Sequence, residues 1–175
     1  MFRDRRVLIA LSSVALIIAI IAIALYVVLY VIKLPAEPGI YIHFTGPQYL
    51  LPGETCIKIE LVEPEQATLI AFKCFGGLPS TIFIPYKLLE PGLKKWWESL
   101  SKSNVPENAI KTTEVGLIVT ISAGENFYIN SLPIPLDLYK NPRAIQYTVA
   151  VSDGSLQIVE VKEITTKPLD TVPIE

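Results

Sequence analysis

The chain has 175 residues, 51% of them hydrophobic, and a formal net charge of −2. This length allows one ordinary domain with an appendage, and the slightly acidic charge argues against nucleic-acid binding, which needs a basic face. One histidine and two cysteines are too few for a zinc or copper ligand set, so no metal or other cofactor is expected.

The first element in chain order is an uncharged apolar run, Val7–Ile32. A helix of that length would extend about 39 Å and could cross a bilayer core of about 30 Å with some tilt. A cleaved signal peptide would have a shorter apolar region and a small-residue cleavage site, which the stretch after the run lacks. The run therefore predicts an uncleaved single transmembrane helix that contacts the lipid bilayer.

The charges beside the run predict its orientation. Arg3, Arg5 and Arg6 precede it, whereas only Lys33 closely follows. The positive-inside rule makes residues 1–6 a cytoplasmic tail and places the C-terminal domain outside the cell membrane. The exported part holds 12 Lys/Arg and 16 Asp/Glu, a net charge near −4, so neither nucleic acid nor an anionic membrane surface is expected as its partner.

After a linker at 33–39 that contains two prolines, the chain favours short strands separated by turn signals. Alternating Ile57, Ile59 and Leu61 indicate a half-buried strand, whereas the continuously apolar stretch 67–75 indicates a strand covered on both faces. Pro85 makes stretch 80–89 either an edge strand or two pieces. Strands are predicted at 40–45, 55–62, 67–75, 80–89, 115–121, 126–130, 144–151 and 155–164. The Asp153-Gly154 turn predicts a hairpin between the last two, and the tail 165–175 is expected to fray.

One helix interrupts the strands, within 91–104. Its apolar stripe consists of Leu93, Trp96, Trp97 and Leu100 at positions i, i+3, i+4 and i+7. Two interpretations stay open: the indoles cover an open side of the sheet, or the stripe is a candidate partner surface.

Many short strands with Gly/Pro turns predict a mainly β protein, a sandwich or barrel, over residues 40–164. The stretches YLLPGETCIKIEL (49–61) and IQYTVAVSDGSLQIVEV (145–161) resemble the second strand and the closing hairpin of immunoglobulin-like surface domains, with Tyr147 in place of the penultimate strand's tyrosine. The resemblance implies an antiparallel sandwich of about 7–8 strands with one inserted short helix, and it implies no activity. The cysteines are not at the usual inter-sheet spacing.

The two cysteines, Cys56 and Cys74, lie on consecutive predicted strands. A three-residue loop centred on Glu65 would pair residues whose numbers sum to 130, and would therefore place the two cysteines directly opposite each other. A two-residue loop would put the sulfurs on opposite faces. In an oxidising compartment a disulfide is expected, with two buried thiols or a redox-active pair as alternatives.

No catalytic residue is predicted. The chain lacks a GxSxG motif, a GxGxxG motif and a Walker lysine, and His43 is expected to be an ordinary strand residue. The leading hypothesis is therefore a membrane-anchored accessory subunit that binds an unidentified protein partner or self-assembles.

Two other hypotheses stay open. The stretch RRVLIALSSVALIIAIIAIALYVVLYV (5–31) resembles the N-terminal helix of archaeal type IV pilins, and the resemblance implies a filament subunit with a β-rich head. Many prolines and a single methionine are compatible with a thermophilic source. The third hypothesis is a small non-catalytic or thiol-bearing subunit of a membrane oxidoreductase.

Overall fold

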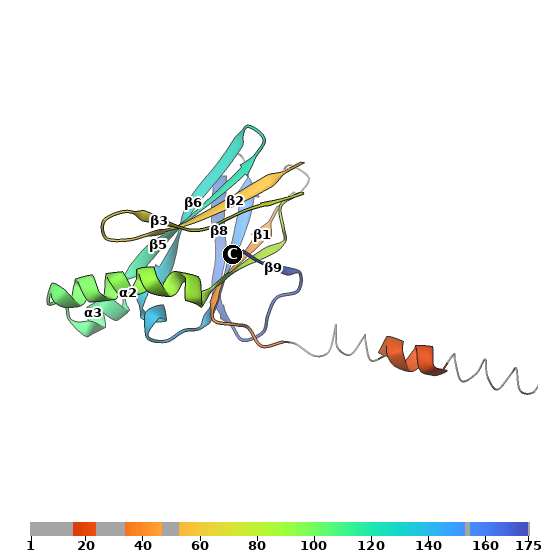
Figure 1. Cartoon of the computed structure of the whole chain (residues 1–175), viewed down its shortest axis with the longest axis horizontal. Helices are drawn as coiled ribbons and strands as arrows, with labels where there is room; N and C mark the ends of the chain where they lie inside the picture. Colours follow the sequence, from red (N-terminus) through yellow and green to blue (C-terminus); the bar gives the residue numbers. More distant parts are fainter. Residues whose placement is uncertain (1–15, 24–33, 47–52, 153–154, 175) are drawn as a thin grey trace, which may run out of the picture. The chain divides into compact units, whose positions relative to one another are not determined.

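The structure, a computed structural model, describes residues 16–23, 34–46, 53–152 and 155–174 (Figure 1). The chain forms two compact units, Met1–Pro35 and Ala36–Glu175. In the first unit, residues 16–23 form a helix whose apolar side chains are exposed. The rest of the predicted span Val7–Ile32, with the arginines before it, lies outside the described residues. Within the described residues, no helix has the length and apolarity needed to cross a membrane.

The second unit is a sandwich of two sheets, as the mainly β composition predicted. One sheet has the order β8-β7-β1-β4-β9 and the other β3-β2-β5-β6 (Figure 1). The strand bounds are β1 Gly39–Thr45, β2 Thr55–Val62, β3 Ala67–Phe75, β4 Thr81–Pro85, β5 Glu114–Ala123, β6 Asn126–Pro135, β7 Ala144–Ser152, β8 Ser155–Ile164 and β9 Thr171–Pro173. The helices are α2 Tyr86–Lys102, α3 Glu107–Lys111 and the 3-10 turn η3 Leu136–Tyr139.

The strand order differs from that of immunoglobulin domains. There, the first two strands pair within one sheet, whereas here β1 and β2 belong to different sheets. Two pairs are also parallel, β1 with β7 and β4 with β9, so the expected all-antiparallel arrangement is wrong. The immunoglobulin-like topology is therefore not confirmed, and the confirmed fold is a mixed two-sheet sandwich.

The core lies between the two sheets, where the inward side of each strand is apolar. On β2 the predicted alternation is confirmed, since Ile57, Ile59 and Leu61 are fully buried while the residues between them are half-buried. Fully burying one such side chain contributes about 1.5–3 kcal/mol. Facing core residues from the other sheet include Ile40, Ile42, Ile82, Ile84, Tyr147 and Val149.

One strand prediction is wrong, and the two alternatives for a second are decided. The β3 strand is not covered on both faces; it is the edge of its sheet, and Leu69 and Phe72 are 55% and 56% exposed. The stretch 80–89 divides into two pieces at Pro85, where β4 ends and α2 begins. β4 is an interior strand, because β9 pairs with its outer side.

The C-terminal tail is docked rather than frayed. Its strand β9 pairs parallel with β4, and the Ile174 N–H donates a hydrogen bond to the Phe83 carbonyl over 3.0 Å. The Ile174 side chain is fully buried in the core. Backbone pairing together with apolar burial therefore holds a segment for which proline content predicted flexibility.

Candidate functional site

The predicted disulfide between Cys56 and Cys74 is confirmed, with an S–S distance of 1.99 Å. Both cysteines lie on the side of the β3-β2-β5-β6 sheet that faces away from the core. Cys74 is exposed and Cys56 is half-buried. The bond is therefore open to solvent, on the surface of the sheet.

The predicted three-residue turn at Glu65 is wrong. The turn spans residues 63–66 and is closed by a hydrogen bond from the Glu63 N–H to the Gln66 carbonyl, 2.8 Å long. Next to it, paired residue numbers sum to 129, as in Glu60 with Leu69. At Ile70 a bulge adds one unpaired residue to β3. On the far side of the bulge, paired residue numbers sum to 130, as in Ile59 with Ala71. The cysteines therefore oppose each other because of the bulge and not because of the turn.

The Glu54 carboxylate lies near the disulfide, since its oxygen and the two sulfurs fall within 4.8 Å of one another. A metal would need thiolate ligands, and both sulfurs are joined to each other instead. In its disulfide form this cluster is therefore not a metal centre.

The surface around the disulfide is the outer face of the four-stranded sheet, made of the outward-pointing residues of β3, β2, β5 and β6. The strand register arranges these residues in four rows. The rows are Cys74–Cys56–Ser122–Phe127, Phe72–Lys58–Thr120–Ile129, Leu69–Glu60–Ile118–Ser131 and Ala67–Val62–Gly116–Pro133.

Large apolar side chains lie open on this outer face. Leu69 is 55% exposed, Phe72 56%, Ile129 63% and Phe127 69%. Single exposed apolar residues are normal on a protein surface, whereas several on one sheet face indicate an interaction site. Sequence analysis missed this face, because its residues are of the same types as the core residues.

An ion pair lies in the middle of the outer face. Lys58 Nζ is 2.8 Å from a carboxylate oxygen of Glu60, two residues along β2. The glutamate side chain is only 21% exposed, whereas the lysine side chain is 44% exposed. The face therefore combines an apolar border with one charge of each sign at its centre.

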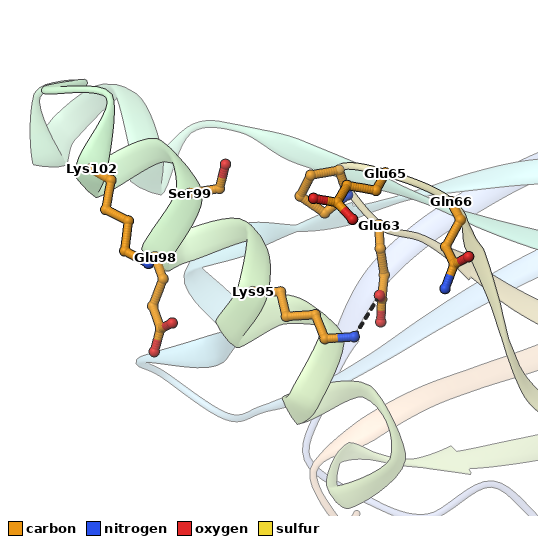
Figure 2. A pocket seen from close by; sticks show the side chains of 8 residues that line it. Glu63, Glu65, Gln66, Lys95, Glu98, Ser99 and Lys102 are labelled. Atoms are coloured by element: carbon orange, nitrogen blue, oxygen red, sulfur yellow. Dashed lines mark hydrogen bonds and ion pairs between the residues drawn. The ribbon is translucent and has the colours of Figure 1, made fainter.

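A hollow of about 380 Å³ lies between the 63–66 turn and α2 (Figure 2). At its wall, Lys95 Nζ lies 2.7 Å from Glu63, whose side chain is only 7% exposed. The Trp96 Nε1–H donates to the Val62 carbonyl over 2.6 Å. Gly92 lets the helix approach closely, since a methyl group there would lie 2.4 Å from Leu61 Cδ2. These contacts attach α2 to the end of β2, and the hollow carries both charge signs without a built ligand site.

The candidate partner surface of α2 is largely turned toward the protein. Leu93 is fully buried and belongs to the core, which corrects its assignment to a surface. Trp96, Trp97 and Leu100 are half-buried and pack against the core. Trp97 also contacts Tyr139, with ring centroids 5.9 Å apart. The indoles thus cover the sandwich, and partner binding by their exposed parts stays a prediction.

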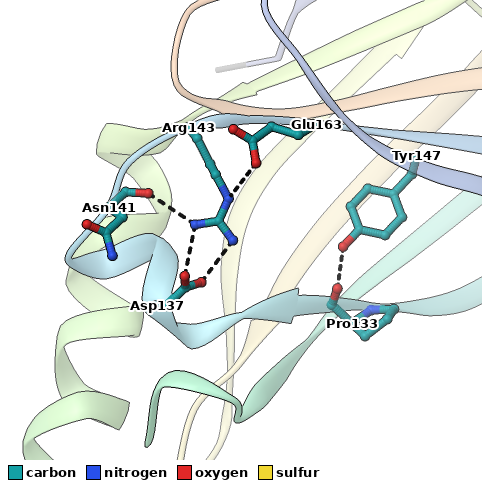
Figure 3. Close-up of polar contacts among 6 residues, drawn as sticks. All are labelled: Pro133, Asp137, Asn141, Arg143, Tyr147 and Glu163. Carbon is teal, nitrogen blue, oxygen red and sulfur yellow. Dashed lines mark hydrogen bonds and ion pairs between the residues drawn. The ribbon is translucent and has the colours of Figure 1, made fainter. Parts of the chain in front are cut away.

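The other polar contacts are structural. Arg143 donates two hydrogen bonds to the Asp137 carboxylate, over 3.0 and 3.1 Å, and its Nε lies 3.2 Å from Glu163, which ties η3 to β7 and β8 (Figure 3). The Tyr147 hydroxyl donates to the Pro133 carbonyl of the opposite sheet. Burial, followed by the nearby Glu114 charge, raises the pKa of Tyr147 to about 12. Tyr147 is therefore a cross-sheet link within the core.

His43, the chain's one histidine, is a half-buried strand residue whose Nδ1 lies 3.0 Å from Thr81 Oγ1. This contact brings no second catalytic group to the imidazole.

Comparison of the chain with known protein families, with curated proteins and with solved structures finds no match to any of them.

Proposed function

We propose that this chain is a membrane-anchored, extracytoplasmic β-sandwich that acts by binding another protein through the outer face of its four-stranded sheet. The observation that carries the proposal is the exposure of Leu69, Phe72, Phe127 and Ile129 on that face. Water-exposed apolar area of this kind favours burial against a partner. The anchor and its orientation rest on the uncharged run Val7–Ile32 and the arginines before it.

The disulfide supports the proposed location. Disulfides persist in oxidising compartments and are rare in the cytosol of most organisms, and this one is accessible to solvent. Both cysteines of the chain are used in it. This favours the binding hypothesis over a subunit that supplies reduced thiols to an oxidoreductase.

The binding role can be tested by site-specific photo-cross-linking in native membranes. A photoreactive phenylalanine analogue at position 72 should form a discrete protein adduct, whereas the same analogue at Leu169, an exposed residue in the loop before β9, should not. Adducts at neither position, or equally at both, would contradict binding through the outer face.

The location can be tested on intact cells. A membrane-impermeant reductant followed by an impermeant maleimide should label Cys56 and Cys74. Labelling that requires lysed cells would place the domain in the cytoplasm and refute the orientation.

A further inference from the structure

We infer that the partner of the outer face is a second copy of this chain, packed face to face with Lys58 of one copy opposite Glu60 of the partner subunit. This inference rests on the proposed function and specifies its partner. It begins from the area available. The four exposed apolar side chains leave roughly 450 Å² of apolar surface per copy, taking about 150–250 Å² for a large side chain. This apolar area alone is more than half of the roughly 800 Å² per partner of a standard interface, and the outward residues of β2 and β5 lie between these side chains.

The charges select the second copy. In an isologous dimer one two-fold axis relates the copies, so every contact occurs twice. Suppose that this axis lies between the two facing sheets and runs perpendicular to the strands at the level of Ile59. Each strand then faces the same strand of the partner subunit, and the two β2 strands run in opposite directions. Lys58 of one copy then faces Glu60 of the partner subunit, and Glu60 of the first copy faces Lys58 of the partner subunit. An unrelated protein would need separate complementary charges, whereas a second copy carries them already.

The same axis sets three of the four exposed apolar residues of the outer face against apolar residues of the partner subunit. It exchanges the Phe72 row with the Leu69 row, so that Phe72 lies opposite Leu69 of the partner subunit. It likewise sets Phe127 against Pro133 of the partner subunit. Ile129, which belongs to the Phe72 row, lies opposite Ser131 of the partner subunit. Opposite charges meet at the centre, where charge complementarity fixes the register of the two copies.

A charge-exchange experiment on the full chain in detergent micelles tests this. The wild-type chain should be a dimer by analytical ultracentrifugation. Lys58→Glu alone and Glu60→Lys alone should each raise the dimer dissociation constant at least about tenfold, because like charges then face each other twice. A one-to-one mixture of the two variants should form a heterodimer, detected by energy transfer between two dyes. Both variants lose the ion pair within the chain, so recovery in the mixture reports contact between copies.

Apolar variants provide the matched control. Phe127→Lys should dissociate the dimer, whereas Leu169→Lys, at a residue of comparable exposure outside the face, should not. A cooperative urea unfolding transition, followed by tryptophan fluorescence, verifies that each variant is folded. A monomeric wild type, a dimer that survives Phe127→Lys, or a mixture that stays monomeric would overturn the inference. A monomeric wild type with a photo-adduct to a different protein at position 72 would overturn only this inference and leave the proposed function standing.

Discussion

Replacing Gly92 by alanine tests how α2 is fitted to the sandwich. A methyl group at this position would lie 2.4 Å from Leu61 Cδ2 and 3.1 Å from a Glu63 carboxylate oxygen. Carbon atoms in contact are normally about 3.5–4.0 Å apart, so the methyl group intrudes by more than about 1 Å. Leu61 is fully buried and has little room to move away.

The helix cannot easily withdraw either. Trp96 is hydrogen-bonded to the Val62 carbonyl, and Lys95 is paired with Glu63. Forcing extra volume into a packed site costs about 1–3 kcal/mol, and losing these two contacts adds to that cost. Alanine in place of glycine regains up to about 1 kcal/mol of helix propensity. We expect Gly92→Ala to lower the free energy of unfolding by about 1–2 kcal/mol.

The assay is urea unfolding of the full chain in mild detergent, followed by tryptophan fluorescence. Both tryptophans of the chain lie in α2, so the signal reports on this helix. Gly77→Ala is the control, because no atom lies within 4 Å of a methyl group placed there; its effect should stay within about 0.5 kcal/mol. If Gly92→Ala stabilises the protein as helix propensity alone predicts, the close approach of helix and strand is refuted.

Three further predictions use the same unfolding assay. Replacing both cysteines by serine should lower the free energy of unfolding by about 3 kcal/mol, because the disulfide closes a loop with a sequence separation of 18. Wild-type protein that is reduced before unfolding should match this variant. Equal stability of the oxidised and the reduced protein would contradict the expectation. Lys95→Met should lower the free energy of unfolding by about 1–2 kcal/mol, because it leaves the nearly buried Glu63 carboxylate without its cation. Lys94→Met is the control: it removes a longer contact between exposed side chains and should change the stability little. The raised pKa of Tyr147 keeps its phenol neutral in the folded state, whereas the unfolded chain loses this proton from about pH 10. Between pH 10 and 12 the free energy of unfolding of the wild type should therefore fall by on the order of 2 kcal/mol relative to Tyr147→Phe. Parallel curves of stability against pH for the two proteins would refute this.

Local features of the fold were predictable from the sequence. The bounds of β2, β3 and β8 agree with their predictions, because alternation and turn residues mark strand ends within a few residues of chain. The order of strands in the sheets was not predictable in this way. The parallel pairs of β1 with β7 and of β4 with β9 join segments about 100 residues apart, and no local pattern records such contacts.

The helix and the tail show why local signals fail. The apolar stripe predicted a helix within 91–104, yet α2 begins at Tyr86 and contains Pro91. The tail carries two prolines, yet the burial of Ile174 and its bond to Phe83 hold it in place. In both segments, contacts with distant residues outweigh the local preference.

The bulge at Ile70 explains why the disulfide was predicted correctly from an incorrect turn, and why Leu69 and Phe72 lie on one face. Residues two apart on a regular strand point to the same side, but the bulge places Ala71 in the core and Leu69 on the outer face. Without the bulge, the four-residue turn would set Cys56 opposite Lys73 and direct both Cys74 and Phe72 inward. Because Ile70 bulges out of the ladder, the disulfide can form and Leu69 and Phe72 lie on the same side of β3. The disulfide and the β3 part of the apolar surface that we propose for binding therefore depend on one register. Deletion of Ile70 joins Leu69 directly to Ala71 and keeps Phe72 opposite Lys58 and Cys74 opposite Cys56, so both features should survive it. Loss of the disulfide in this variant would refute the register.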